Sequence, residues 1–468
     1  MQAIKAGKIC EAVSGSLVCG KNKQLVKGVS IDSRTIEPGQ LFVAIIGENH
    51  DGHSFIGEAV RKGAGAVISQ RNINIQNDIP LVLVEDTTVA LQQLANYYRN
   101  LFPQLGVIAV TGSAGKTTTK DMIAAVLNQK FTVKKTEGNL NNHYGLPLTL
   151  LELTGDEDFA VLEMGMSSRG EIRKLARIAE PDTGVVTNVG PAHLETLRTV
   201  ANVARAKAEL IEELPADGRA VLNYDDNYVQ KMKHIFSGEE LYYFSLEEEN
   251  VDYFVDNINY DRASERLLFS VFQGEKRKKV DYYLSKPGIH NIYNALPACI
   301  LGDRMGLSCQ EIQDGLFNCD FSGLRMDIVD RKGYRIINDT YNANPLSMKA
   351  ALDALQHSSS GRKIAVLGDM LELGPHKEEA HREIGKYTAS LGIEYLVVLG
   401  DLMAYAADSA RRAGMPDWRI FMADSKEEIA KILADILQKE DTILLKGSRG
   451  MEMEKVIELY VKQEDEKN

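Results

Sequence analysis

The stretch VIAVTGSAGKTTTKD (residues 107–121) places an apolar run directly before two glycines, a lysine and three threonines. Such a run is typical of a parallel strand that is covered on both faces. Gly112 and Gly115 let the backbone approach a phosphate closely, and the start of the following helix favours an anion. Lys116 can reach the outer phosphates, and the hydroxyl of Thr117 can bind Mg²⁺. The sequence therefore predicts a phosphate-binding loop between a strand and a helix.

The loop is shorter than the usual phosphate-binding pattern, in which another glycine stands five positions before the glycine of the Gly-Lys pair. Here that position holds Val110, and the first glycine of the loop is Gly112. The alternative is a plain glycine turn with a surface lysine. We favour the phosphate-binding loop because strand, turn and helix follow one another in the order that it needs.

The overall charge is acidic, with 54 lysines and arginines, 66 aspartates and glutamates, and a net charge of −12. Nucleic acids and anionic membranes bind basic faces, so neither is expected as a partner. No apolar run approaches the length of a membrane span, and the first 15 residues have no long apolar core typical of a signal peptide. The five cysteines include no C-x-x-C pair and are expected to be free thiols. These features predict a cytoplasmic protein without membrane insertion.

Strand-like and helix-like patterns divide the chain into three blocks. Residues 1–103 alternate short apolar runs with helical stretches, which predicts a small α/β domain. Residues 104–319 contain the loop and the strand-like runs FAVLEMG, TGVVTNVG and RAVLNYDD, separated by helical patterns. This rhythm is typical of a doubly wound, mostly parallel sheet. Around residues 240–285 the segments LYYFSL, RLLFSVF and KVDYYLS favour an antiparallel excursion.

The third block, residues 320–468, repeats one form in KIAVLGD, YLVVLGD and DTILLKG, where an apolar run ends in glycine beside a polar residue. We interpret these segments as parallel strands of one sheet. Asp369, Asp401 and Lys446 would then lie at carboxyl ends of strands, where open α/β sheets place ligands. The predicted fold class is thus α/β with three domains.

Polar side chains also follow two strand-like runs near the loop. Glu163 ends FAVLE and His193 follows VVTNVGPAH, so both are expected at the same sheet edge as the loop. A carboxylate there can hold Mg²⁺, although an imidazole is an unusual ligand for this ion. The alternatives are a solvated charge for Glu163 and a capping residue for His193. Lys207, in the helical segment TVANVARAKAELIEEL, has the pattern of a solvated helix lysine.

Another polar cluster lies in PGIHNIYNALPA, where His290, Asn291 and Asn294 stand at a helix start. The amide of an asparagine can recognise an adenine edge through its paired donor and acceptor. N-capping by Asn291 is the alternative. Further on, Arg325 in FSGLRMDIV can contact phosphate, ribose or a surface carboxylate.

Two more polar turns precede helices in the third block. INDTYNANPLSMKAAL places Asn and Asp residues before Pro345, which is either a ligand site or turn chemistry alone. LLKGSRGMEMEKV places Lys446 and Arg449 in a glycine turn after a strand. Such a basic turn suits an anionic substrate group, and solvated side chains are the alternative.

Taken together, these motifs resemble a known family over essentially the whole chain. VTGSAGKTT resembles the loop of the Mur ligases, Thr-Gly-x-x-Gly-Lys-Thr/Ser, which lacks the first glycine of the usual motif. HNIYNALPA, NDTYNANP and LLKGSRGMEMEKV match the same family in the same order. DTYNANP, VLGDMLELG and the first block are similar to the members that use D-alanyl-D-alanine. The Asp-Asn-Pro-Arg motif of tripeptide-forming relatives is absent from this sequence.

The resemblance implies a UDP-sugar substrate-binding domain (1–103), a central ATP-binding domain (104–319) and a C-terminal Rossmann-like domain (320–468). It implies an ATP-dependent ligase that joins D-alanyl-D-alanine to UDP-N-acetylmuramoyl-tripeptide through an acyl phosphate, a step of peptidoglycan biosynthesis. The implied cofactors are ATP and two Mg²⁺ ions. We expect a monomer.

The resemblance also implies roles for individual residues. Lys116, His193 and Lys207 are the expected catalytic residues. Expected ATP contacts are Gly112, Ser113, Ala114, Gly115, Lys116, Thr117 and Thr118 in the loop, Asn294 at adenine, and Arg325 and Asp339 at ribose or phosphate. Expected metal ligands are Thr117 and Glu163 for one Mg²⁺, and His193 with Lys207, as an N-carbamate, for the other. Expected substrate contacts are Ser33, Arg34, Asp51 and His53 for the UDP-sugar, with Asn142, Tyr341, Asn342, Asn344, Lys446 and Arg449.

Two other functions stay open. One is a related ligase that adds a different amino acid, as folylpolyglutamate synthases and other Mur ligases do. The other is a regulatory protein that binds ATP without ligating anything. Which amine triggers phosphate release would separate the first alternative from the expected function, and release that ignores every amine would favour the second.

Overall fold

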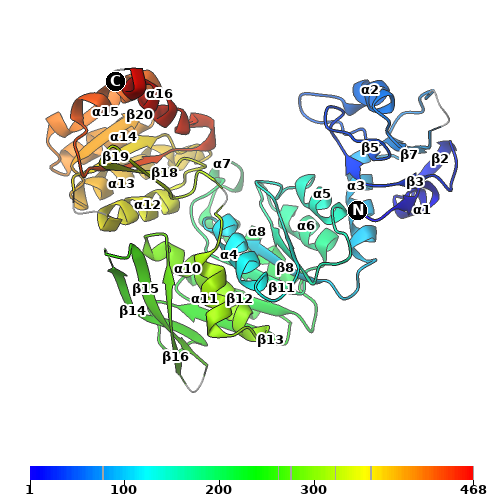
Figure 1. Ribbon diagram of the computed structural model, residues 1–468, viewed down its shortest axis with the longest axis horizontal. Coiled ribbons are helices and arrows are strands. Elements are labelled where there is room, and N and C mark those ends of the chain that lie inside the picture. The colour runs from blue at the N-terminus through cyan, green and yellow to red at the C-terminus, as the bar shows by residue number, and fades with distance from the viewer. Residues whose placement is uncertain (76–78, 262, 275–276, 322, 359–360, 467–468) are drawn as a thin grey trace.

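The computed structural model describes residues 1–75, 79–261, 263–274, 277–321, 323–358 and 361–466. Three α/β units follow one another along the chain, and the two termini lie on the two outer units (Figure 1). Each unit has its own sheet, which confirms the predicted fold class. The boundaries after residues 103 and 319 stay predictions. All five cysteines are free thiols, as expected.

The first unit is built around a small sheet with strand order β2-β7-β6-β5-β4, parallel except for β2. Three of the short apolar runs of the first block form β5, β6 and β7. The elements of this unit are β1 (Ile4–Lys5), α1 (Ala6–Ala12), β2 (Ser16–Cys19), β3 (Leu25–Val26), β4 (Val29–Ser30), β5 (Leu41–Val43), α2 (Ile56–Arg61), β6 (Ala66–Ser69) and β7 (Leu81–Leu83).

Helix α3 (Thr87–Arg99) connects the first unit to the central one. The carboxylate of Asp86 caps it by accepting the amide hydrogens of Thr88 and Val89. Its far end is fixed to the central unit, because the hydroxyl of Tyr98 donates to the carbonyl of Leu153 at 2.5 Å. Leu91, Leu94 and Tyr98 of α3 belong to the same apolar core as helices of the central unit, so the helix is a structural part of both units.

The central unit contains a nine-stranded sheet in the order β16-β15-β14-β13-β12-β11-β8-β10-β9. Strand β8 (Gly106–Thr111) lies between β10 (Phe159–Glu163) and β11 (Thr183–Val186), and both neighbours are parallel to it. Ile108 and Val110 of β8 face the core under α4 (Lys116–Leu127), α10 (Ile289–Arg304) and α11 (Cys309–Phe317). Val107 and Ala109 face α5 (Gly145–Leu151), α6 (Glu171–Ala179) and α8 (Val200–Glu212). The predicted double winding is therefore present, with the loop at the carboxyl end of β8.

The predicted antiparallel excursion is narrower than expected. Strands β14 (Tyr253–Asp261), β15 (Arg266–Gln273) and β16 (Lys278–Leu284) pair antiparallel with one another. The segment LYYFSL was wrongly included, because β13 (Glu240–Ser245) pairs parallel with β12 (Arg219–Asn223) and with β14. The remaining elements are β9 (Val133–Lys135), α7 (Leu194–Leu197) and α9 (Asn227–Gln230).

The third unit has a six-stranded sheet in the order β17-β18-β22-β19-β20-β21, parallel except for β17. Its strands are β17 (Asp327–Arg331), β18 (Tyr334–Asp339), β19 (Lys363–Gly368), β20 (Tyr395–Leu399), β21 (Ile420–Ala423) and β22 (Thr442–Lys446). Thus KIAVLG, YLVVL and TILLK form parallel strands of one sheet, as predicted.

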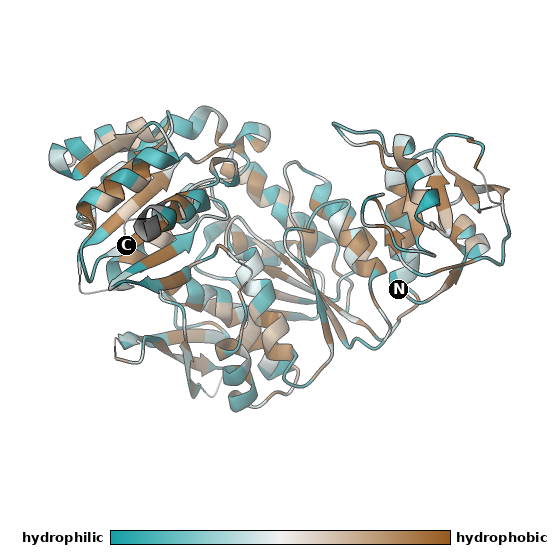
Figure 2. Ribbon diagram, turned by 45° about the horizontal axis from the view of Figure 1, so that its top comes forward, coloured by the Kyte–Doolittle hydropathy of each residue, from teal (hydrophilic) through white to brown (hydrophobic). Residues whose placement is uncertain are grey.

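Helices cover both faces of this sheet. The core on one face contains residues of α12 (Pro345–Ser358), α13 (Lys377–Ser390) and α14 (Met403–Arg412). The core on the other face contains residues of α15 (Lys426–Ile436) and α16 (Glu454–Glu466). The apolar residues gather in the strands and in the helix faces turned toward them (Figure 2). Within the described part of the chain, no helix combines the length and apolar character needed to cross a bilayer.

We predict that Tyr98→Phe lowers the free energy of unfolding by about 1–3 kcal/mol, because the buried carbonyl of Leu153 loses its hydroxyl donor. Tyr97→Phe is the matched control, since no described residue hydrogen-bonds its hydroxyl; we expect a change of at most about 0.5 kcal/mol. Urea denaturation followed by circular dichroism measures both. Equal loss in the two variants would show that the contact does not hold α3 to the central unit.

Candidate active site

The two loop glycines lie where a side chain would not fit. Gly115 is the N-cap residue of α4 with φ 82°, and a Cβ there would stand 2.1 Å from the Oδ1 atom of Asn294. A Cβ on Gly112 would stand 1.8 Å from the Oγ1 atom of Thr187. The loop backbone is therefore packed directly against β11 and α10, leaving its other side for a ligand.

Two polar residues after β11 hold the loop in place. The carbonyl of Ala114 accepts hydrogen bonds from the hydroxyl of Thr187 at 2.7 Å and from the amide of Asn188 at 3.1 Å. The amide hydrogen of Ala114 is donated to Oδ1 of Asn188 at 2.9 Å. The hydroxyl of Ser113 is bonded to Gly190. Thr187 and Asn188 were not predicted, although they lie in the segment TGVVTNVG, directly after β11.

Positive charge gathers in front of the loop. Lys116 donates to the carbonyl of Gly112 at 3.0 Å. Burial lowers the pKa of Lys116, Glu163 opposes this shift, and Arg325 adds to it. Arg325 stacks on the ring of Tyr341 at 3.9 Å, and its buried Nε has no hydrogen-bond partner among the described residues. An anion beside Lys116 and Arg325 would satisfy both cations.

Glu163 is buried at the end of β10, so its interpretation as a solvated charge is wrong. One carboxylate oxygen accepts from the hydroxyl of Thr117 at 2.7 Å, and the other from the amide of Asn141 at 2.8 Å. Hydroxyl and carboxylate oxygens fit Mg²⁺, which usually completes its coordination with water and substrate phosphate. The described residues include no group of three or more His, Cys, Asp or Glu side chains placed to hold a metal, so phosphate and water would have to supply the other ligands.

The predicted contact Asn142 is exposed and lies just before α5, where its side chain accepts the amide hydrogens of Tyr144 and Gly145. Its neighbour Asn141, which contacts Glu163, was not predicted. The run of three asparagines interrupted by a leucine (NLNN) was the available signal, but it does not tell which of them faces the metal position.

A buried network beneath the site fixes the backbone of Glu163. The fully buried Lys120 donates to the carbonyl of Thr136 at 2.6 Å and pairs with Asp121 at 3.1 Å. The hydroxyl of Thr136 accepts the amide hydrogen of Glu163 at 3.0 Å. Helix α4 thereby sets the position of the segment that runs from Thr136 to Asn141.

His193 joins the central unit to the third unit. It is the N-cap residue of α7 with φ 51°, so the alternative of a capping position is confirmed, although its side chain makes no capping bond. Its Nδ1 lies 2.7 Å from a carboxylate oxygen of Glu372, a residue that was not predicted. This hydrogen bond lowers the pKa of Glu372. A carboxylate on one ring nitrogen orients the other toward a ligand.

Lys207 is buried, so its interpretation as a solvated lysine is wrong. Its ammonium forms no hydrogen bond or ion pair with any residue that the structure describes. Burial lowers its pKa well below the usual value, and the charge of Lys116 adds to this effect. The helical periodicity contained the signal, because Lys207 shares the apolar face of α8 with Val203, Leu210 and Ile211.

Helix α10 brings polar residues against the loop and the third unit. Asn294 is buried, and its Oδ1 accepts from the hydroxyl of Thr119 at 3.4 Å. Asn291 is not the helix cap; Gly288 occupies that position, and the amide of Asn291 donates to the carbonyl of Pro287. Burial lowers the pKa of His290 to about 4, with Asp339 opposing the shift.

The carboxyl ends of β18 and β22 complete the site. Lys446 is buried and pairs with Asp339 at 2.5 Å, so its interpretation as a solvated lysine is wrong. It also donates to the carbonyl of Asn342 at 2.9 Å. The amide of Asn344 reaches across to the carbonyl of Ser113 at 3.1 Å. Arg449 remains exposed and pairs with Glu454.

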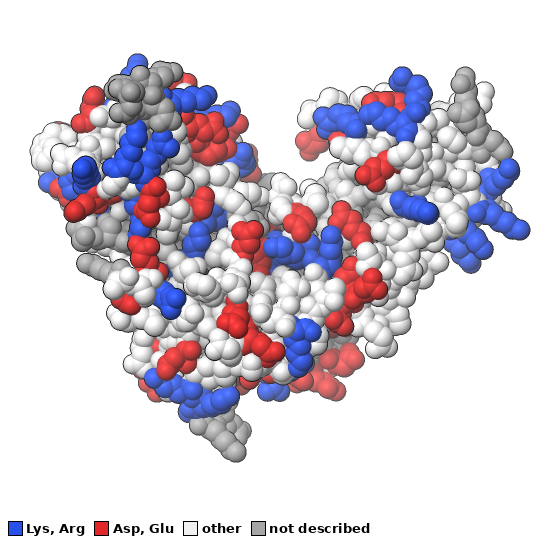
Figure 3. All heavy atoms as spheres, in the orientation of Figure 1, with Lys and Arg blue, Asp and Glu red and all other residues white. Residues whose placement is uncertain are grey.

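The predicted contacts of the first unit lie apart from this cluster. The hydroxyl of Ser33 donates to Glu58 at 2.8 Å, and the exposed Arg34 pairs with Asp32. His53 is enclosed, with one ring nitrogen beside Asp51 at 2.7 Å and the other accepting the amide hydrogen of Gln70. A broad hollow separates the first unit from the third (Figure 3).

We predict that Gly115→Ala weakens ATP binding at least about tenfold, because the added methyl group meets Asn294. Gly170→Ala is the matched control. Gly170 is also a helix N-cap glycine, with φ 87°, but a Cβ there meets open space. Both variants carry the same backbone strain, so only the first should change the dissociation constant measured by calorimetry. Equal weakening would show that strain, not the approach of Asn294, sets the requirement for glycine.

Comparisons with known proteins agree with this geometry. The Mur ligase family catalytic domain matches residues 25–136, the Mur ligase middle domain residues 110–302, and the Mur ligase glutamate ligase domain residues 324–449. The UDP-N-acetylmuramoyl-tripeptide--D-alanyl-D-alanine ligase of Bacillus subtilis is 38% identical over 96% of each chain. The ligase of the same name from Escherichia coli is 36% identical over 92% of each chain.

Solved structures resemble the whole chain as well. The crystal structure of MurF from Acinetobacter baumannii has a TM-score of 0.89 at 29% identity and covers 99% of each chain. MurF ligase from Thermotoga maritima in complex with ADP has a TM-score of 0.84 at 30% identity, over 95% of this chain and 99% of that one. With a truncated phosphate loop, a carboxylate on its threonine and full-length relatives of this kind, the chain belongs to the Mur ligase family.

Proposed function

We propose that this protein is an ATP-dependent amide ligase that joins D-alanyl-D-alanine to UDP-N-acetylmuramoyl-tripeptide to form the pentapeptide precursor of peptidoglycan. The observation that carries the proposal is the cluster around the loop, where the charge of Arg325 is near enough to lower the pKa of Lys116 and Thr117 bonds Glu163. The substrates are those named for the full-length relatives at 36–38% identity.

The proposed reaction brings negative groups together. An oxygen of the substrate carboxylate attacks the γ-phosphorus of ATP, the bond to ADP breaks, and an acyl phosphate forms. The amine of D-alanyl-D-alanine then attacks the acyl carbon, loses a proton and expels phosphate. Lys116 and Arg325 would offset the repulsion in the first step, because fixed cations in a dry site stabilise a transferring phosphoryl group.

Two Mg²⁺ ions are part of the proposal. Bound at this position, they would neutralise charge on the phosphates. Thr117 and Glu163 would supply the oxygens for one ion. His193 is proposed for the other through Nε2, which bonds no residue that the structure describes, since Nδ1 lies beside Glu372.

Lys207 is proposed to act as an N-carbamate at the second ion. Its amine is buried near Lys116 and is without a carboxylate partner among the described residues. The ammonium would first lose a proton to give the neutral amine, which its lowered pKa favours. Addition of CO₂ to this amine, with loss of a second proton, would then leave an anion where a repelled cation stood. Burial excludes water from around the carbamate, so its negative charge would be attracted to the positive charge of Lys116.

We assign the binding of D-alanyl-D-alanine to the third unit and that of the UDP-sugar to the first. Tyr341, Asn342 and Asn344 are proposed for the D-alanyl-D-alanine side because they follow β18 at the edge that contacts the loop. In the first unit, Arg34 is the exposed cation of the proposed UDP-sugar site. Ser33, Asp51 and His53 are bonded within the unit, so we assign them the task of shaping that site.

We predict that ADP production by the purified protein needs both UDP-N-acetylmuramoyl-tripeptide and D-alanyl-D-alanine. A coupled enzyme assay for ADP measures this, with single amino acids in place of the dipeptide as controls. Release driven by glutamate or another amino acid would favour the related ligase. Release that ignores all amines would favour a regulatory ATP-binding protein.

We predict that Lys116→Ala abolishes turnover while the far-ultraviolet circular dichroism stays that of the parent protein. The reason is the loss of the cation that faces the phosphates, which costs more than about 2.7 kcal/mol of transition-state stabilisation in comparable sites. Lys130→Ala is a control beyond the other end of α4, where Lys130 donates to the carbonyl of Gly306 and lies over the ring of Phe131. Near-normal amide formation by Lys116→Ala would overturn the loop assignment.

We also predict that Lys207→Ala is inactive and that a short carboxylate such as formate restores part of its activity. Carbon-13 NMR of the parent protein in labelled bicarbonate should show one carbamate signal that Lys207→Ala lacks. Full activity of Lys207→Ala without any added carboxylate would exclude the carbamate from the reaction.

A further inference from the structure

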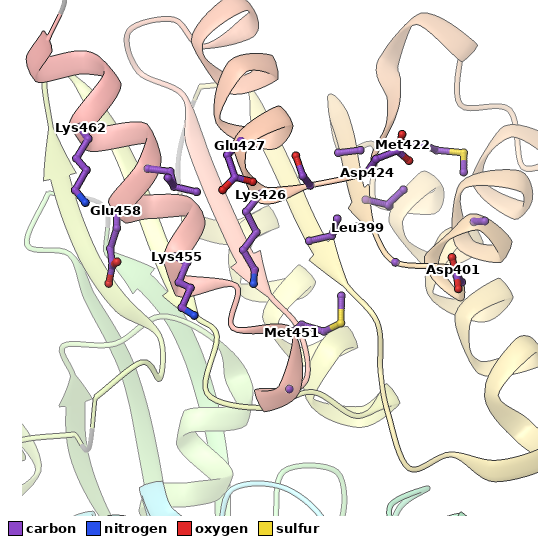
Figure 4. A pocket seen from close by; sticks show the side chains of 17 residues that line it. Leu399, Asp401, Met422, Asp424, Lys426, Glu427, Met451, Lys455, Glu458 and Lys462 are labelled. Carbon is purple, nitrogen blue, oxygen red and sulfur yellow. The ribbon is translucent and has the colours of Figure 1, made fainter.

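The third unit contains a second crevice, away from the catalytic cluster. It has a volume of about 820 Å³ and lies at the carboxyl ends of β20 and β21 (Figure 4). Its lining comes from the ends of these strands, the start of α15, the turn before α16 and one face of α16. None of the residues that line this crevice is among those assigned to the ligation reaction above.

The topology of the sheet places this crevice at a point where ligands bind in open α/β folds. Strand β20 leads into α14, which packs on one face of the sheet, and β21 leads into α15, which packs on the other. Adjacent strands whose helices leave to opposite faces open a gap at their carboxyl ends, and this gap is the usual ligand position. Gaps of about 300–1,000 Å³ are the size of small-molecule sites.

The start of α15 offers free donors to this gap. Ser425 caps the helix by accepting the amide hydrogen of Glu428. The amide hydrogens of Lys426 and Glu427 have no acceptor among the described residues. The start of α14, by contrast, is already satisfied, because Asp369 accepts the amide hydrogens of Met403 and Leu402.

Positive charge lies on the same side. Lys426 and Lys455 share a single carboxylate, Glu452, at 3.9 Å and 2.6 Å. Lys462 lines the crevice from the next turns of α16 and has no partner in the part of the chain that the structure describes. In Figure 4 Lys426 and Lys455 project into the crevice, with Glu427 and Glu458 beside them, and Asp424 also lines it. An anionic group there would meet two ammonium groups and two amides and would have to compete with these carboxylates for the lysines.

The opposite side carries different chemistry. Asp401 follows the end of β20, on the far side of the crevice from α16 (Figure 4). In nucleotide-binding α/β folds, a carboxylate just beyond the end of a strand accepts hydrogen bonds from the ribose hydroxyls. Leu399 and Met451 lie between the two sides, and the exposed Met422 lies on the side of Asp401 (Figure 4). These three side chains offer an apolar surface to a flat ring.

We propose that this crevice binds a nucleoside monophosphate, with the phosphate at Lys426 and Lys455, the ribose at Asp401 and the base on Met422 and Leu399. The turn after β20 reads GDLM and lacks the glycine-rich fingerprint of dinucleotide sites, so one phosphate held by lysines fits better than a pyrophosphate. The proposed site does not depend on the ligation reaction, so a result against one proposal leaves the other unchanged.

A local fluorescence probe tests the proposal. The chain has one tryptophan, the exposed Trp418, so Trp418→Phe with Met422→Trp places the only indole on the crevice wall. All proteins carry Lys116→Ala as background, to disable the phosphate loop. Titration with AMP should give a saturable change in indole emission, and adenosine should bind at least about tenfold more weakly, because it lacks the phosphate.

Charge variants of α15 complete the test. Lys426→Ala should weaken AMP binding at least about tenfold, whereas Lys431→Ala, an exposed lysine of the same helix outside the crevice, should leave it within about twofold. Absence of a saturable signal up to millimolar AMP overturns the proposal. Equal affinity for adenosine and AMP, or equal affinity of the two lysine variants, overturns it as well.

Discussion

The active site depends on cationic side chains that form no ion pair with any residue that the structure describes. Lys116 lies near both Arg325 and Lys207 at the junction of the central and third units, and Glu163 is the carboxylate near Lys116. Burying like charges is costly unless an anion joins them. Close packing of the loop glycines, stacking of Arg325 on Tyr341 and burial of Lys207 hold these side chains and the loop in place.

The geometry around this charge comes from three parallel strands that end together. Strands β10, β8 and β11 deliver Glu163, the loop and Thr187 to one edge of the central sheet. Strands β18 and β22 deliver Asp339 and Lys446 to the facing edge of the third sheet. The contacts of Asn344 with Ser113 and of His193 with Glu372 join the two edges, so chemistry at the loop and the placement of the third unit are coupled.

Much of this arrangement could be predicted from the sequence, because it follows from local patterns. Apolar runs that end in glycine and polar residues located β8, β19, β20 and β22, and the resemblance supplied the ligand roles. The failures have a common physical cause. Lys207 and Lys446 were interpreted as solvated because charge type says nothing about packing, and only the three-dimensional core encloses them.

Other residues were missed because their role is to hold a neighbour. Asn141, Asn188 and Glu372 contact groups that lie 22, 74 and 179 positions away in the chain. No periodicity links such pairs, since they meet only when strands from distant segments align. Likewise β13 looked antiparallel because alternation marks an exposed face, not the direction of pairing.

Helix α3 has a consequence for how the molecule can be divided. By order along the chain it ends the first unit, yet its apolar side is part of the central core. A fragment that ends just after α3 would expose the apolar face of this helix to water. The rest of the chain would lack the side chains that α3 contributes to the central core. Dissection for separate expression should therefore cut near residue 85, in the short connection after β7, and leave the helix with the ATP-handling portion.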